Sequence, residues 1–177
     1  MIRNDVEVVE TTRQRLGPVG VWLAAAQAAI DRERQAARRI EELGYGSIWI
    51  PEGLAGKEAF AHQSLLLAAT ERIVTGTGIA NVWARHPATM QGGAATLGAA
   101  YPGRFVLGIG ISHAPMAEGS GQAYEKPLDR MAHYLDGMDA AAAAAPATEI
   151  CRAAVGNRRI CGSVAMGDPC AGKAATM

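Results

Sequence analysis

The sequence predicts an α/β fold with a parallel sheet, and three observations lead to this prediction. Short apolar runs alternate with longer helical segments, four times in succession between residues 17 and 145. The apolar runs are short and largely continuous, which is typical of strands buried on both faces. The chain of 177 residues is long enough for one domain with a sizeable core. This alternation fits both a doubly wound sheet and part of a (β/α)8 barrel.

The first two β-α units follow a charged N-terminal arm, residues 1–16. Val19–Leu23 and Ser47–Ile50 are short apolar runs and are predicted to be strands. Between them, Ala28–Leu43 carries its apolar side chains on one face and its charged side chains on the other, which predicts an amphipathic helix. Gly44 is a typical residue for the C-terminal end of such a helix.

The later units continue the same alternation of helices and strands. The predicted elements are a helix at Lys57–Thr70, a strand at Ile73–Val82, a helix of small residues (TMQGGAATLGAA) after Pro87, a strand at Phe105–Ile111, a loop at Ala114–Glu125 and a helix from Pro127 to about Ala145. Proline at the start of a helix is in a favoured position. Glycine inside a helix lowers its stability but allows the backbone to approach a sheet closely.

Composition excludes several classes of function. The chain has 17 basic and 17 acidic residues, so no excess of positive charge indicates nucleic acid or an anionic membrane as a partner. No apolar run approaches the roughly 20 residues of a membrane-spanning helix. The polar N-terminus lacks the apolar segment of a signal peptide. We therefore expect a soluble, cytoplasmic protein.

The last segment, residues 146–177, differs from the rest. It has no period of two or of 3.6 residues, and it contains all three cysteines: Cys151, Cys161 and Cys170. Their wide spacing fits neither a zinc site nor a redox pair, and no metal site is expected. We expect free thiols in a disordered or loosely packed tail. The predicted organisation is thus an arm (1–16), a β-α domain (17–145) and a tail (146–177).

Candidate functional residues follow the ends of the predicted strands. Parallel barrels carry their chemistry at the carboxyl ends of the strands. Glu52 follows the second strand, Gly78-Ile79 lies near the end of the third, and Gly108, Gly110, Ser112 and His113 end the fourth. Glycines allow a ring or a phosphate to approach the backbone, and serine and histidine can bond or exchange protons. Each has a simpler alternative: a solvated carboxylate, an ordinary bulge, or a surface or helix-capping histidine.

Three segments together resemble a known family. LGYGSIWIPE, TGTGIANVWARHP and GRFVLGIGISHAP occur in the order and spacing of the luciferase-like monooxygenase superfamily, and they are most similar to its branch that uses the deazaflavin coenzyme F-420. The resemblance runs from Gly17 to Asp139. It implies an α/β fold of the (β/α)8 TIM-barrel type, truncated to about four β/α units, and so favours the barrel over the doubly wound sheet.

The resemblance also implies site roles. A bulge with a cis peptide at Gly78-Ile79 would support the cofactor ring. The implied cofactor-binding residues are Trp22, Gly78, Ile79, Ala80, Gly108, Gly110 and Ser112, and the implied catalytic residues are Glu52 and His113. Arg85, beside His86, could bind the acidic tail of the cofactor. Trp83 could pack against the ring, although buried aromatic residues at strands more often belong to the core.

The activity implied is hydride transfer between coenzyme F-420 and a small organic substrate. Two alternatives stay open: an FMN-dependent monooxygenase that acts on a small substrate with molecular oxygen, and a non-catalytic truncated or frameshifted remnant. In this family, loops of the second half help to hold the phosphate of the cofactor. A half-barrel would leave Val21, Ile48 and Val106 uncovered on its inner side, so we expect a homo-oligomer.

Overall fold

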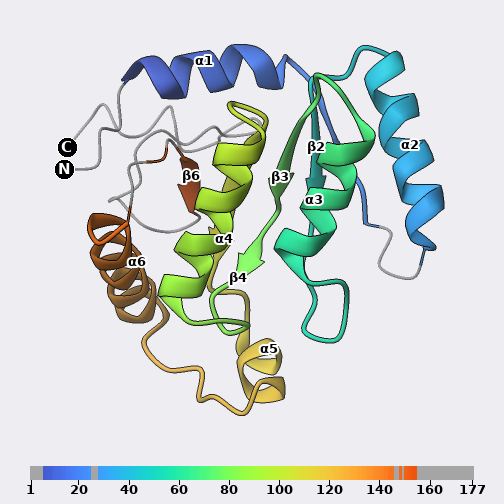
Figure 1. Cartoon of the computed structure of the whole chain (residues 1–177). Coiled ribbons are helices and arrows are strands. Elements are labelled where there is room, and N and C mark those ends of the chain that lie inside the picture. Colours follow the sequence, from blue (N-terminus) through green and yellow to red (C-terminus); the bar gives the residue numbers. More distant parts are fainter. Residues whose placement is uncertain (1–5, 25–27, 146–147, 149, 155–177) are drawn as a thin grey trace, which may run out of the picture.

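The computed structural model describes residues 6–24, 28–145, 148 and 150–154. One parallel sheet forms its centre (Figure 1). The helices are α1 (Val6–Leu16), α2 (Ile30–Glu42), α3 (Ala59–Ala69), α4 (Pro87–Ala100), α5 (Ala114–Gly119) and α6 (Pro127–Ala143). The strands are β1 (Gly20–Trp22), β2 (Ser47–Ile50), β3 (Val74–Thr77), β4 (Ala80–Asn81), β5 (Phe105–Gly110) and β6 (Cys151–Ala154).

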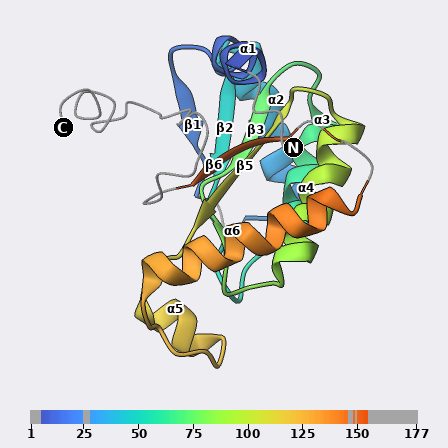
Figure 2. The same ribbon diagram turned by 90° about the vertical axis from the view of Figure 1, so that its left-hand side faces the viewer.

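The strand order is β1-β2-β3-β5-β4. Strand β5 pairs with β3 through its first residues, with β4 through its last residues, and also with β6. Every pairing in the sheet is parallel. This confirms the predicted α/β class and parallel sheet. Helices α2, α3 and α4 pack on one face of the sheet, α1 crosses the end at which the strands begin, and α5 lies beyond the opposite end (Figures 1 and 2). The carboxyl ends of the strands therefore meet on the side of α5.

The helices bury the outward side chains of the strands. Ile48 and Ile50 of β2 pack with Leu66 of α3 and Ala37 of α2. Farther along the sheet, β5 packs under α4 and α6 in a larger cluster that includes Leu107. Residues one apart on a strand point to opposite faces, so only alternate residues enter this layer.

The inner face is covered near its amino-terminal end. Leu16, the last residue of α1, packs with Trp49, Val74, Val106 and Cys151 in a separate buried cluster. The expectation that Ile48 and Val106 would be uncovered is therefore wrong, because both are fully buried. Ile48 faces the helices, and α1 together with β6 covers Val106. Val21 is half-buried, at the edge strand.

Three local elements differ from the prediction. Residues 73–82 form two short strands, β3 and β4, rather than one. The predicted loop at Ala114–Glu125 contains the short helix α5. The segment expected to be a loose tail contributes β6, which pairs with Val106–Ile109 of β5, so that expectation is wrong for these four residues. Cys151 is a free, buried thiol, and burial raises its pKa. Cys161 and Cys170 lie outside the described residues.

Glu41 of α2 stabilises the start of β3. Its carboxylate accepts backbone hydrogen bonds from Glu71 (3.1 Å), Arg72 (2.6 Å) and Ile73 (2.7 Å). Burial acts to raise the pKa of this carboxyl, but the three hydrogen bonds and the charge of Arg72 outweigh it and lower the pKa. The ionised carboxylate thus connects α2 to the turn between α3 and β3.

Glu41→Gln is expected to lower the free energy of unfolding by about 1 kcal/mol at pH 7, because charge-assisted hydrogen bonds become neutral ones. A lowered folded-state pKa gives stability that is present above the unfolded pKa and is lost as the pH falls through the folded value. The difference between wild type and variant should therefore shrink on acidification. Urea unfolding at pH 7 and at about pH 3 measures it. Glu42→Gln, at an exposed pair with Arg39, is the matched control and should change little.

No helix in the described part of the chain is long and apolar enough to span a membrane.

Candidate functional site

A bulge lies between β3 and β4, which together occupy the place of the third predicted strand. Gly76 of β3 pairs with Val106, whereas Ala80 of β4 pairs with Ile109. Between these two pairs, the segment β3–β4 advances by four residues while β5 advances by three. One residue of the segment therefore has no counterpart in β5, which defines a β-bulge. The peptide bond between Gly78 and Ile79, inside this bulge, is cis, as the resemblance implied.

The backbone on both sides of this peptide is bonded to the end of β2. Gly78 N–H donates to the carbonyl of Ile50 (2.8 Å), and Glu52 N–H donates to the carbonyl of Ile79 (3.3 Å). The indole ring of Trp22 lies against Gly78: a Cβ placed at position 78 would come within 2.7 Å of it. Trp22 is 51% exposed, so part of this ring is open to a ligand. The bulge therefore presents a flat, partly open surface.

The end of β5 lies beside the bulge. A Cβ at Gly110 would come within 2.6 Å of the side chain of Ile79. Gly108 is buried, and its carbonyl accepts a hydrogen bond from the hydroxyl of Thr77 (2.7 Å). The tertiary structure thus brings together four of the predicted cofactor-binding residues: Trp22, Gly78, Ile79 and Gly110. Ala80 is fully buried among the core residues below them.

Ser112 and His113 continue from β5 toward α5. Ser112 has a left-handed backbone (φ 53°), and its hydroxyl lies 3.3 Å from Nδ1 of His113. Tyr124 holds this turn by donating its hydroxyl to the carbonyl of Ser112 (3.1 Å). The imidazole of His113 is exposed and makes no capping hydrogen bond to α5. Tyr124 is not among the predicted site residues, because no local sequence pattern connects it to a residue 12 positions away.

Glu52 and Arg85 form a buried ion pair with two contacts between the carboxylate and the guanidinium. Their side chains are only 4% and 8% exposed. Neither the solvated carboxylate considered for Glu52 nor a free guanidinium at Arg85 is present. A catalytic role for Glu52 stays a prediction. Glu52 and Arg85 carry opposite charges, and each follows the end of a predicted strand. This placement is the sequence pattern that could have indicated the pair.

His86 and Trp83 have structural contacts. Nδ1 of His86 accepts the backbone N–H of Ala88 (3.2 Å) and so caps α4. Trp83 is buried, and its indole N–H donates to the carbonyl of Ile111 (2.6 Å). Trp83 therefore belongs to the core, as buried aromatic residues most often do.

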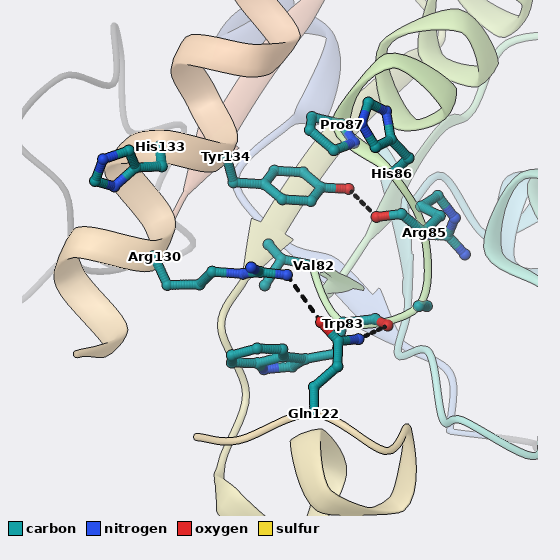
Figure 3. A pocket seen from close by; sticks show the side chains of 10 residues that line it. Val82, Trp83, Arg85, His86, Pro87, Gln122, Arg130, His133 and Tyr134 are labelled. Carbon is teal, nitrogen blue, oxygen red and sulfur yellow. Dashed lines mark hydrogen bonds between the residues drawn. The ribbon is translucent and has the colours of Figure 1, made fainter. Parts of the chain in front are cut away.

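A cavity of about 520 Å³ lies outside the strand ends, between the loop after β4 and helix α6 (Figure 3). Its lining is Val82, Trp83, Ala84, Arg85, His86, Pro87, Gln122, Arg130, His133 and Tyr134. Figure 3 shows the hydroxyl of Tyr134 directed to the carbonyl of Arg85 and the guanidinium of Arg130 directed to Gln122. Burial raises the pKa of Tyr134. Trp83 and Arg85, which were considered as contacts of the cofactor, line this cavity, whereas Trp22, Gly78, Ile79, Ala80, Gly108, Gly110 and Ser112 do not.

The residues described by the structure contain no group of three or more potential metal ligands. The bulge instead offers an aromatic surface and glycines, and the exposed imidazole of His113 lies in the turn that follows β5. Such a surface suits a planar organic ring, with a proton donor or acceptor nearby.

Comparison with known proteins gives three main matches. An F-420-dependent glucose-6-phosphate dehydrogenase of Microbacterium testaceum is 36% identical over 83 residues, which is 42% of this chain and 25% of that protein. An F-420-dependent secondary alcohol dehydrogenase, solved with an F-420–acetone adduct, superposes with a TM-score of 0.61 at 22% identity, over 68% of this chain and 40% of its own. The oxygenating constituent of 3,6-diketocamphane monooxygenase from Pseudomonas putida, solved with FMN, has a TM-score of 0.61 at 17% identity, over 68% and 37%.

These matches confirm the predicted luciferase-like, TIM-barrel type of fold. The chain spans 25–31% of the length of the curated relatives it matches and 37–42% of the solved chains. A sequence model of the luciferase-like monooxygenase family matches residues 15–150, which is most of the chain. This chain therefore belongs to the luciferase-like monooxygenase family.

Proposed function

We propose that this chain contributes the deazaflavin-binding half of an F-420-dependent oxidoreductase that acts on a small organic substrate. The observation that carries the proposal is the bulge at Gly78-Ile79, with the half-exposed ring of Trp22 against it. Relatives named as F-420-dependent support the choice of cofactor. A bound deazaflavin supplies the hydride chemistry, and the protein positions it.

The residues of the chain would divide this work. The bulge Gly78-Ile79-Ala80 and Trp22 would support the ring, with Gly110 leaving room beside Ile79. Ser112 would donate its hydroxyl to a polar edge of the ring. His113 would exchange a proton with the substrate, because its imidazole is exposed and lies in the turn that follows β5, three residues after Gly110.

FMN is the second candidate cofactor. The observation that favours it is the FMN complex of the diketocamphane monooxygenase, which has the same fold over most of this chain. With FMN the activity would be a monooxygenation that consumes molecular oxygen. A non-catalytic remnant and a homo-oligomer both stay predictions of the sequence.

Coenzyme F-420 is expected to bind the purified chain with a dissociation constant near or above one micromolar. The chain spans under a third of the curated relatives, and each charge-assisted contact to phosphate that the remainder would supply is worth about 1.5–3 kcal/mol. Fluorescence titration measures the binding, and a parallel titration with FMN separates the two cofactors.

Gly78→Val tests the position of the ring. A valine side chain would displace Trp22 and occupy the surface of the bulge, so binding should weaken about tenfold or more. Gly92→Ala, on the exposed side of α4, is the matched control and should leave binding unchanged. Unaltered binding in Gly78→Val would show that the ring lies elsewhere.

A further inference from the structure

The carboxylate of Glu52 is fully occupied by groups of the protein. Oε1 accepts the backbone N–H of Ala59 (3.1 Å), and Oε2 accepts the backbone N–H of Asn81 (2.8 Å). The guanidinium of Arg85 contacts both oxygens. Because the side chain is only 4% exposed, these contacts leave little of the carboxylate accessible to a ligand.

These contacts converge on the bulge. The backbone N–H of Glu52 donates to the carbonyl of Ile79, and the carboxylate of the same residue binds the N–H of Asn81. One residue at the end of β2 thus holds the segment 79–81 at both ends. The third contact, to Ala59, ties the same carboxylate to the first turn of α3.

Arg85 is itself fixed from several directions. Its guanidinium also bonds the carboxylate of Glu58 (2.9 Å) and lies 5.2 Å from the centre of the Phe60 ring. Its backbone carbonyl accepts the hydroxyl of Tyr134 (2.8 Å). A planar guanidinium held in this way presents two donors to one carboxylate in a defined orientation. The orientation of Glu52 therefore depends on Arg85.

We propose that Glu52 and Arg85 are positioning residues: their buried pair holds backbone segment 78–81, and so sets the surface that receives the cofactor ring. This inference rests on the proposed function for the identity of the ligand. It assigns Glu52 a role through the backbone and leaves proton exchange to His113. Replacing either residue removes the two parallel charge-assisted hydrogen bonds between the guanidinium and the carboxylate, so each substitution should release the segment.

Hydrogen exchange measured by mass spectrometry tests the pair without any ligand. In Glu52→Gln and Arg85→Lys, the backbone amides of residues 78–82 should exchange about tenfold faster or more than in the wild type. The amides of β5 (105–110) should exchange no faster than the change in global stability of each variant predicts. Arg85→Lys keeps the charge but loses the two parallel donors, so it carries the test if Glu52→Gln does not fold.

Glu33→Gln is the matched control. Glu33 is equally buried, at 2% exposure, and pairs with Lys57 and His62 between α2 and α3. It contacts no residue of segment 78–81 in the hydrogen bonds that the structure gives it. Its loss should therefore lower overall stability without selectively raising exchange in residues 78–82. Equal acceleration in this control would mean that the effect in Glu52→Gln reports general destabilisation, and would overturn the proposal.

Titration with coenzyme F-420 gives the second readout. Both variants should raise the dissociation constant about tenfold, by the same factor from about pH 6 to pH 8, because no proton is exchanged. Unchanged exchange in residues 78–82 together with lost binding would mean that Glu52 contacts the cofactor directly, and would overturn the proposal. If the wild type binds no F-420, the proposed function fails, and the exchange rates alone still decide whether the pair holds the segment.

Discussion

Gly108→Ala is expected to lower the free energy of unfolding by about 3 kcal/mol, because added atoms in a packed interior force backbone shifts. Gly108 lies in the middle of β5, and a Cβ there would overlap the carbonyl oxygen of Thr77 in the neighbouring strand. That oxygen belongs to the backbone immediately before the bulge. It cannot be moved by a side-chain rotation, so the strand itself would have to shift. Urea unfolding followed by circular dichroism measures the change.

Gly92→Ala is the control for this substitution. Gly92 is exposed in α4, and no heavy atom outside the neighbouring turns of its own helix backbone lies within 4 Å of a Cβ built there. Alanine should therefore stabilise the protein by about 0.5–1 kcal/mol through its higher helix propensity. A Gly108→Ala variant as stable as the wild type would show that β3 and β5 can separate at this point without loss.

Deleting residues 147–177 is expected to cost about 3 kcal/mol more than deleting residues 155–177, since only the longer deletion removes β6. In β6, Cys151 is buried with Leu16 and Val106, and Arg152 forms an ion pair with Asp139 of α6 (2.9 Å). Loss of β6 would expose the edge of β5 and part of the buried cluster that contains Leu16 and Val106.

The two deletions are compared by their urea unfolding midpoints and slopes. The slope should fall in the longer deletion, because less surface is buried in its folded state. Equal stability of the two chains would mean that residues 147–154 contribute no stability, as expected of a loosely packed tail. Lower stability in the longer deletion alone would show that the stabilising residues of this segment lie at 147–154.

Local sequence patterns were sufficient for most elements of the fold. The apolar residues of Ala28–Leu43 recur at helical spacing, and the amphipathic helix α2 forms there. The run SIWI forms β2, buried at all four positions, as a strand covered on both faces requires. Pro87 and Pro127 start α4 and α6. In each of these segments, propensity, periodicity and the terminal residue all favour the same structure.

Short segments were less predictable. The strand β6 has only four residues and no alternating pattern, so its position depends on the unpaired edge of β5 rather than on its own sequence. The six residues of α5 begin at Ala114-Pro115 inside a run rich in glycine and serine, which favoured a loop. Elements of this length gain too little from local interactions to be specified by them.

By itself the sequence determined the parallel α/β arrangement, the order of its units and, through the resemblance of three segments, the place of the bulge at Gly78-Ile79. Only the tertiary structure decided that Glu52 pairs with Arg85, 33 residues away, and that Trp22 lies against Gly78. The physical reason is that helix and strand patterns repeat over a few residues and are visible in one segment. A contact between strand ends depends on how the strands are placed side by side, and that is set by the packing of the whole sheet against its helices.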